Sequence, residues 1–373
     1  MSEYILEVKN LRTSFFTHLG EVQAVRDISY KLKKGGILGI VGESGSGKSV
    51  SSLSIIRLVD SPGKIVHGEI NFDGIDLTKI STKKMQDLRG SEIAMIFQDP
   101  MTSLNPVYTI KNQLLEVIMK HVRITKEQAL EEAKKIKDLE RQKKAIKRIE
   151  NGITRRINKK EALERAIYYL KLVGIPEPET RIKEYPHQFS GGMRQRALVA
   201  MALSCEPKLI IADEPTTALD VTIQAQILDL LKKIKKELDT TIIFITHDLG
   251  VIAELCDDVI VMYGGMIMEK GSVNDIFYRP QHPYTKGLHQ SIPKDVVGQK
   301  KRLVPIAGSP PDLLNPPKGC PFNPRCRYAM EICLEKPAPL FAISNTQSSA
   351  CWLQDENAPD VEGFKKSGGV LSE

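Results

Sequence analysis

The segment Gly42-Glu-Ser-Gly-Ser-Gly-Lys-Ser49 constrains this chain more than any other, because it fits the pattern G-x-x-x-x-G-K-[ST] at every specified position. The apolar run 37–41 before it is typical of a buried parallel strand, and residues 50–59 after it are expected to be helical. Glycines let such a loop turn tightly, so that its N–H groups and the helix N-terminus face an anion. Lys48 would then contact the β and γ phosphates of a nucleotide, and the Ser49 hydroxyl would bind Mg²⁺. The alternative is a Gly/Ser-rich turn with a chance lysine, which the flanking strand and helix disfavour.

The length and composition predict an ordinary soluble protein. A chain of 373 residues suggests two domains, or one large domain with an appendage. Its 41% hydrophobic and 27% charged residues are usual for a globular fold. The first 30 residues lack a basic-then-apolar signal pattern, and no run approaches the roughly 18 apolar residues of a membrane helix. We therefore expect a cytoplasmic protein, which could work on a membrane only by docking onto chains that span it.

The net charge of +7 raises the question of a nucleic-acid partner. Residues 126–165 contain 14 Lys and Arg against 8 Asp and Glu, and so carry six of the seven net positive charges. The rest of the chain is close to neutral, whereas nucleic-acid binding usually needs a distributed basic groove. We expect no nucleic-acid partner, and we interpret the charged segment as a solvated helix face rather than a binding tail.

Two short strands, 5–8 and 28–32 with a turn around Gly20, are expected to form an antiparallel layer ahead of the phosphate-binding segment. Phe15 lies on this layer and could stack on an adenine ring, although Phe15 or Phe16 could equally be core. Farther on, the apolar strand 93–98 stops at Gln98. A polar side chain at a strand end is a candidate ligand for Mg²⁺ or water, a weak signal by itself.

Residues 110–181 have a helical pattern. Thr125-x-x-Gln128 is a capping box that opens a helix ending at Asn151-Gly152, and Asn158-x-x-Glu161 opens a second helix that ends at Gly174. The first helix is expected to be continuous through an apolar stripe formed by Ala129, Ala133, Ile136, Leu139, Ile146 and Ile149.

Three later segments carry polar groups suited to nucleotide chemistry. Ser190-Gly-Gly-Met193 at a helix N-terminus is a second anion site, which could serve a nucleotide held by another chain. The strand 209–213 delivers Asp213, expected to hold Mg²⁺ through water, and Glu214, expected to polarise the attacking water. The strand 242–247 ends in His247, which could contact the γ-phosphate. Taken singly, the carboxylates could be capping groups and the histidine structural.

These motifs, in this order, resemble an ATP-binding cassette (ABC) ATPase over about residues 4–270. The resemblance implies an α/β P-loop core with a mostly parallel sheet, an N-terminal antiparallel β layer, an inserted helical subdomain and a small Cys-rich C-terminal tail. It also implies head-to-tail pairing of two cassettes, each completing the other's ATP site. Met193 departs from the commonest signature, which has glutamine there, but the glycines are intact.

The resemblance assigns roles residue by residue. The catalytic residues would be Glu214, His247 and Gln98, and Mg²⁺ would be held by Ser49, Gln98 and Asp213. The nucleotide-binding residues implied are Phe15, Gly42, Glu43, Ser44, Gly45, Ser46, Gly47, Lys48, Ser49, Val50, Gln98, Asp213, Ser190, Gly191, Gly192, Met193 and Asp220.

After a Pro-rich linker, four cysteines lie close together in sequence, at Cys320, Cys326, Cys333 and Cys351. In a cytosolic protein, clustered cysteines are more often metal ligands than disulfides. Four thiolates suit zinc or an iron–sulfur cluster, and their spacing does not choose between the two. Cys205 and Cys256 stand alone in apolar surroundings and are expected in the core.

The segment Gln281-His-Pro-Tyr284, the signature at 189–196 and the Cys-rich tail look like the oligopeptide/dipeptide importer branch of ABC ATPases. This branch implies a homologous second ATPase subunit, two membrane-spanning permeases and an extracellular solute-binding protein, with this chain at the cytoplasmic face of the membrane. It also favours a [4Fe-4S] cluster over zinc. The segment at about 125–157 departs from the branch as an insertion.

We expect an ATP-binding core over 1–105 and 205–275, a helical subdomain over 106–204 and an extension over 276–373. The sequence does not decide between peptides and another transported solute, such as a nickel chelate. The competing hypotheses are a soluble ABC ATPase acting on nucleic acid or ribosomes, and a non-hydrolysing regulatory subunit. The second would be expected to have lost Lys48, Glu214 or His247, all of which are present.

Overall fold

The computed structural model describes residues 3–99, 103–136, 138–150, 154–217, 220–238, 240–291, 305–367 and 369–370. The chain forms two compact units. The first comprises residues 1–85, 211–214 and 231–373, and the second comprises 86–210 and 215–230. Within the described residues, no helix combines the length and the apolar character needed to cross a membrane.

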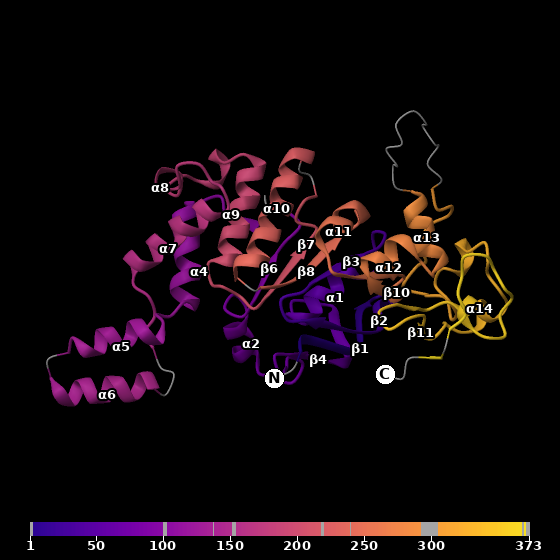
Figure 1. Ribbon diagram of the computed structural model, residues 1–373, viewed down its shortest axis with the longest axis horizontal. Coiled ribbons are helices and arrows are strands. Elements are labelled where there is room, and N and C mark those ends of the chain that lie inside the picture. The colour runs from indigo at the N-terminus through magenta and orange to yellow at the C-terminus, as the bar shows by residue number, and fades with distance from the viewer. Residues whose placement is uncertain are drawn as a thin grey trace. The chain divides into compact units, whose positions relative to one another are not determined.

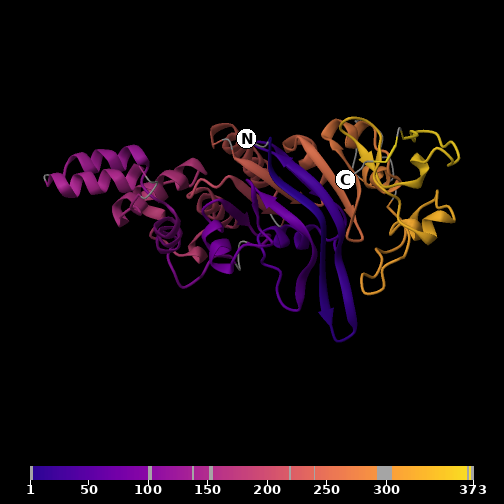
Figure 2. The same cartoon turned by 90° about the horizontal axis from the view of Figure 1, so that it is seen from below.

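The first unit begins with an antiparallel sheet in the order β2-β1-β4-β5. Its strands are β1 (Tyr4–Thr17), β2 (Gly20–Lys33), β4 (Gly63–Phe72) and β5 (Ile75–Asp76). The expected antiparallel layer is confirmed, but β1 and β2 are much longer than the two short segments predicted. They stay paired up to Thr17 and Gly20, and the register shifts along β1 explain why its apolar alternation is broken in sequence. Figure 2 shows this long hairpin.

The second sheet of this unit has the order β11-β12-β10-β9-β3-β8-β7. Its strands are β3 (Ile37–Val41), β7 (Leu209–Asp213, of which the last three residues belong to this unit), β8 (Thr241–Thr246), β9 (Asp258–Tyr263), β10 (Met266–Ser272), β11 (Phe341–Ala342) and β12 (Ser348–Ser349). Strand β3 pairs in parallel with both β8 and β9. Every residue of β3, β7 and β8 is buried, which explains their continuous apolar runs and confirms the expected buried strand.

The helices of the first unit are labelled in Figure 1. They are α1 (Lys48–Ile55), α2 (Thr82–Leu88, which continues into the second unit), α10 (Val221–Leu238, from Leu231 on), α11 (Leu249–Leu255), α12 (Val273–Tyr278), α13 (Pro283–Gln290) and α14 (Ile332–Glu335), with 3₁₀ turns at Asn323–Arg325 and Trp352–Gln354.

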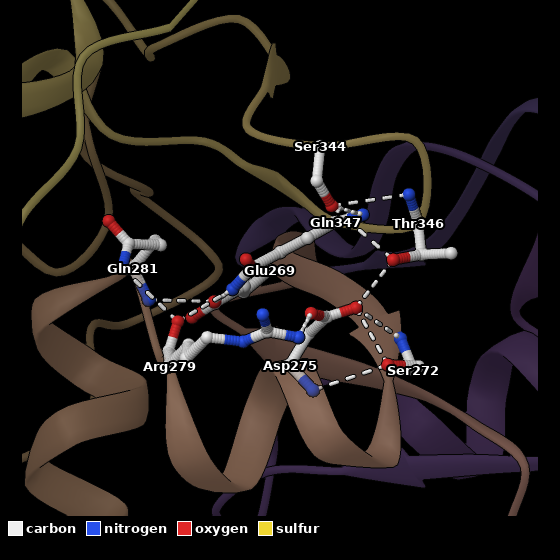
Figure 3. A network of polar contacts seen from close by, with 8 residues as sticks. All are labelled: Glu269, Ser272, Asp275, Arg279, Gln281, Ser344, Thr346 and Gln347. Carbon is white, nitrogen blue, oxygen red and sulfur yellow. Dashed lines mark hydrogen bonds and ion pairs between the residues drawn. The ribbon is translucent and has the colours of Figure 1, made fainter.

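The C-terminal region is joined to β10 by a buried polar network (Figure 3). The Glu269 carboxylate accepts from the backbone N–H groups of Gln281 and His282 and from the side chain of Gln347, at 2.7–2.9 Å. The Thr346 hydroxyl donates to Asp275 at 2.6 Å. Because a fully buried carboxylate needs such partners, this network holds the C-terminal segment against the sheet.

The second unit is mostly helical. It contains β6 (Ile93–Ile96) beside the first residues of β7, the first part of α10, and α4 (Ile110–His121), α5 (Lys126–Lys134), α6 (Leu139–Glu150), α7 (Lys159–Leu172), α8 (Pro178–Arg181), a 3₁₀ turn at Pro186–Gln188 and α9 (Gly191–Leu203). The capping boxes at Thr125 and Asn158 are both present, as predicted. The predicted stop at Asn151-Gly152 lies outside the described residues.

The prediction of one continuous helix after Thr125 is wrong. The segment forms two helices, α5 and α6, which lie side by side in both views (Figures 1 and 2). Asp138 explains the break, because its carboxylate accepts from the backbone N–H of Arg141 at 2.8 Å and so caps the start of a new helix. Folding back also lets Arg155 donate to both Glu132 of α5 and Glu161 of α7.

Candidate nucleotide site

The phosphate-binding loop connects β3 to α1 within the first unit. Lys48, the first residue of α1, is buried, and its Nζ donates to the carbonyl oxygens of Gly42 at 2.8 Å and Glu43 at 3.0 Å. The lysine therefore points back into the loop that precedes it. Burial lowers the pKa of Lys48, and the nearby acidic groups Glu214, Asp213 and Glu43 oppose this effect. An anion bound in the loop would restore the preference for the charged form.

Two glycines of the loop are required by close backbone approach. A Cβ on Gly42 would lie 2.1 Å from the Met262 carbonyl oxygen, and one on Gly47 would lie 2.4 Å from that of Ala24. Gly47 also has a φ of 95°, which other residues rarely adopt. Gly45 differs, because its φ is 76° but a Cβ there would meet nothing within 4 Å. The loop therefore packs against β9 at Gly42 and against β2 at Gly47, and it is open to solvent at Gly45.

Two oxygen ligands suited to Mg²⁺ meet beside Lys48. The Ser49 hydroxyl donates to Asp213 Oδ1 at 3.0 Å, which joins α1 to the end of β7. Asp213 is buried, and burial raises its pKa, while the bond from Ser49 and the charge of Lys48 lower it. A divalent cation bound here would favour the ionised carboxylate, because Mg²⁺ prefers oxygen ligands.

Glu214 and His247 stand together at neighbouring strand ends. His247 Nδ1 lies 3.4 Å from Glu214 Oε2, and the Glu214 N–H donates to Ile245 O at 2.9 Å. Glu214 has a φ of 45°, in the left-handed region that a side chain rarely adopts. The Glu214 side chain is mostly covered, with 15% exposed, whereas His247 is 62% exposed. A left-handed backbone at a residue other than glycine is local strain, which is typical of functional sites.

The residues present fit a nucleotide phosphate with Mg²⁺. The Ser46 hydroxyl is buried in the loop and has no hydrogen-bond partner among the described residues. A buried hydroxyl without a partner is costly, and a bound phosphate oxygen would supply one. Ser44 and Gly45 are exposed, and Val50 is half-buried in the first turn of α1, so the loop is accessible from one side.

Phe15 and Phe16 lie near the end of β1. Phe15 is half-buried, with its ring against Gly63, whereas Phe16 is 46% exposed with Lys64 Nζ 6.0 Å from its ring centre. Phe15 stays our predicted adenine contact, and the structure adds that Phe16 offers the more exposed ring.

The remaining predicted residues belong to the second unit. Gln98 is exposed and lies two residues beyond β6, which ends at Ile96 rather than at Gln98. The Ser190 hydroxyl caps α9 by accepting from Met193 N–H at 3.3 Å, and Gly191 is exposed. Gly192 faces Ile223, and Asp220 caps the start of α10 through Ile223 N–H at 2.9 Å. The predicted helix N-terminus at Ser190 is therefore present.

The four tail cysteines line one small cavity of the first unit, with apolar walls that include Phe322, Met330 and Trp352. Their predicted role as metal ligands stays a prediction. Burial raises the pKa of Cys320 to about 12 and also raises those of Cys326 and Cys351. Cys205 and Cys256 are both only partly buried, so neither lies fully in the core as predicted.

Two metal groups are considered for this cavity, a zinc ion and an iron–sulfur cluster. Among the described residues, no three His, Cys, Asp or Glu side chains lie close enough to hold one metal ion. Four thiolates on one zinc must each lie about 2.3 Å from the metal, which draws them tightly together. Four cysteines are also the usual donor set of an iron–sulfur cluster, so the residue types suit either group.

The structure also brings to the loop two residues that sequence reasoning did not assign to it. Arg325 of the tail pairs with Glu43, and the Tyr284 hydroxyl accepts from the Glu43 N–H. In the sequence, the motif at 281–284 indicated only the resemblance to one branch of the family. No local pattern links Glu43 to a residue 282 positions away.

Comparison with known proteins agrees with this geometry. Residues 25–217 match the ABC transporter family, and residues 268–333 match the C-terminal region of oligopeptide/dipeptide transporters. The chain belongs to the ABC transporter family. This ABC subunit is 52% identical to the oligopeptide transport ATP-binding protein OppD of Bacillus subtilis (strain 168), over 96% of this chain and 91% of that protein. It is 48% identical to the dipeptide transport ATP-binding protein DppD of the same organism, over 95% and 96% of the two chains.

Among solved structures, the ABC subunit is similar to the ATP-binding cassette MJ0796 in a dimeric, post-hydrolysis state bound to ADP and Pi. The TM-score is 0.58 with 25% identity, covering 72% of this chain and 98% of that one. The expected α/β ABC ATPase fold, with its antiparallel layer and helical subdomain, is thereby confirmed. The chain is an ATP-binding ABC ATPase of the transport type.

Proposed function

We propose that this ABC subunit hydrolyses ATP to power the import of dipeptides or oligopeptides across a membrane. The observation that carries the proposal is the meeting of Lys48, Ser49 and Asp213 with the Glu214–His247 pair in one compact unit. The relatives named as oligopeptide and dipeptide transport ATP-binding proteins support the cargo class. A related small solute such as a nickel chelate is the alternative cargo.

The roles of the residues follow from their positions. Lys48 would bind the β and γ phosphates, since its ammonium is held inside the loop. Glu214 would orient and deprotonate the attacking water, and His247 would contact the γ-phosphate. Ser49 and Asp213 would hold Mg²⁺, and the family resemblance adds Gln98 as a further ligand. When bound, Mg²⁺ neutralises phosphate charge.

We propose that the subunit works as a head-to-tail pair with a homologous second ATPase subunit. Ser190 with the first turn of α9, together with Asp220, would then complete the partner's ATP site, because a capped helix N-terminus is suited to an anion. The pair would drive two membrane-spanning permeases fed by an extracellular solute-binding protein, at the cytoplasmic face of the membrane. The helical subdomain over 106–204, with its charged insertion, and the extension over 276–373 remain our proposed divisions.

We also propose that the four tail cysteines hold a [4Fe-4S] cluster, with zinc as the alternative. Their shared apolar cavity supports the proposal. Because the thiols of Cys320, Cys326 and Cys351 have raised pKa values, loading the site would release protons.

The test of the ATPase assignment is Glu214→Gln in the assembled transporter. ATP binding should be retained while turnover falls by at least about 100-fold, the usual contribution of a general base. Glu331→Gln, an exposed acidic residue of the tail, is the matched control and should leave turnover unchanged. Normal turnover in Glu214→Gln would contradict the assignment of the base. Peptide uptake by vesicles containing the complex tests the cargo, and salt-sensitive co-purification of nucleic acid in place of permeases would contradict the transport function.

A further inference from the structure

An ion pair joins the Cys-rich tail directly to the phosphate-binding loop. Arg325 Nη1 lies 2.6 Å from Glu43 Oε2, and Nη2 lies 3.1 Å from Glu43 Oε1. Two parallel bonds from one guanidinium to one carboxylate fix both groups in orientation as well as distance. The Arg325 side chain is 6% exposed and that of Glu43 is 24% exposed, so water screens this pair little.

The rest of the Arg325 guanidinium is also engaged. Its Nη1 donates to the Tyr263 hydroxyl at 3.0 Å, Nη2 to Ile306 O at 3.0 Å, and Nε to Ala307 O at 2.8 Å. Its centre lies 5.6 Å from the Tyr263 ring centre. A lysine could pair with Glu43, but it could not make this set of planar contacts. The site is therefore built for arginine.

A second contact holds the backbone of the same loop residue. The Glu43 N–H donates to the Tyr284 hydroxyl at 2.9 Å. Tyr284 is fully buried in α13, with its ring centre 4.6 Å from that of Tyr263 and 5.3 Å from that of Phe322. The Glu43 main chain and side chain are thus both held by groups from the region after residue 280.

Glu43 in turn contacts the lysine that binds phosphate. Its carbonyl oxygen accepts from Lys48 Nζ at 3.0 Å and from Ser46 N–H at 3.2 Å. We propose that Arg325 and Tyr284 are positioning residues for ATP binding, which act through Glu43 to hold the phosphate-binding loop and Lys48 in a receptive conformation. The proposal rests on the ATPase function proposed above and deepens it, since it makes the C-terminal region part of the nucleotide site's support.

The tail has other attachments, so its docking does not depend on Arg325. Gln347 donates to the buried Glu269 at 2.8 Å, and Thr346 donates to Asp275 at 2.6 Å (Figure 3). The Gln354 side chain donates to Gln281 O at 2.7 Å. Loss of Arg325 should therefore change the loop more than it changes the fold of the tail.

The experiment measures equilibrium ATP binding by the full chain, and the KM and kcat for ATP in the assembled transporter. Arg325→Ala should weaken ATP binding about tenfold, the effect of losing one good charge-assisted contact. It should raise KM while kcat at saturating ATP is largely retained. Arg325→Lys should recover part of the loss. The matched control is Arg327→Ala, because Arg327 flanks Cys326 on the other side, is exposed, and stacks on Tyr328 instead.

Two further variants separate positioning from a general structural role. Tyr284→Phe removes only the hydroxyl and should weaken ATP binding about threefold. This loss corresponds to part of the net free energy of one hydrogen bond. In a Glu43→Ala background, Arg325→Ala should have less than about a twofold further effect, because the two residues act as one unit. Thermal unfolding of each variant verifies that it is folded.

Each result decides the proposal. Non-additive losses at Glu43 and Arg325, with normal binding in Arg327→Ala, support it. Unchanged ATP affinity in folded Arg325→Ala overturns it, and so does an effect fully additive with Glu43→Ala. Failure of the unmodified chain to bind ATP would instead overturn the proposed function, which distinguishes the two failures.

Discussion

His247 Nδ1 lies 3.4 Å from the Glu214 carboxylate, and the two residues follow neighbouring strand ends of one sheet. The carboxylate is largely covered while the imidazole is mostly exposed. The imidazole is therefore accessible to solvent, whereas the Glu214 backbone is hydrogen-bonded to Ile245.

His247→Ala tests this pair. Turnover should fall by roughly 100-fold or more, because the variant loses the group that we propose to contact the reacting phosphate. ATP affinity should change little, because Lys48 and the loop remain. His67→Ala, an exposed histidine on β4, is the control. Steady-state ATP hydrolysis and a parallel ATP-binding assay measure the two effects. A loss of ATP affinity in His247→Ala without a loss of turnover would contradict the assignment.

Gly47 and Gly45 together test whether close backbone approach is what requires glycine in the phosphate-binding loop. Gly47→Ala should damage both ATP binding and stability, because its Cβ would lie 2.4 Å from Ala24 O. Gly45→Ala should be milder, costing about 1–2 kcal/mol for its left-handed backbone alone, since that Cβ meets nothing within 4 Å. The measurements are ATP affinity and chemical unfolding of each variant. Equal damage in both variants would mean that close backbone approach is not the reason for glycine at position 47.

Glu269 predicts a pH dependence of stability. Burial raises its pKa from the usual 4.5 to about 7, although its hydrogen bonds oppose this effect. The folded protein therefore binds a proton more tightly than the unfolded chain, so the contribution of Glu269 to stability falls as pH rises between about 4.5 and 7.

The free energy of unfolding should decline over this window by up to about 3 kcal/mol more in the unmodified chain than in Glu269→Gln. Denaturant unfolding at pH 5, 6, 7 and 8 measures the difference. Identical pH profiles would show that Glu269 stays ionised, held by the donors from Gln281, His282 and Gln347.

The four-cysteine cavity predicts a metal content. Protein purified without oxygen should be brown and contain iron and acid-labile sulfide, and removal of the iron should lower the thermal unfolding temperature because metal binding is coupled to folding. Cys326→Ser should lose iron, while Cys205→Ser, outside the cavity, should keep it. Zinc in place of iron and sulfide would favour the alternative group. Protein that contains neither zinc nor iron would contradict metal binding.

Much of the fold was predictable because its signals are local. The apolar run 37–41 became β3, and the capping boxes at Thr125 and Asn158 began helices. Each signal depends on residues within a few positions, where backbone preference and hydrogen bonding act directly. The break at Asp138 was missed because the apolar stripe around it keeps a helical period, and only the packing of α5 on α6 shows that the chain turns there.

The sequence by itself determined the nucleotide chemistry of this ABC subunit, because the lysine, hydroxyl and carboxylates of its motifs occupy fixed places on strand ends and loops. Only the tertiary structure decided what supports that chemistry. Arg325 and Tyr284 reach Glu43 because the C-terminal region folds against β10 and the β9–β10 turn. Contacts between residues so far apart depend on how buried surfaces pack, and packing leaves no periodic trace in the sequence.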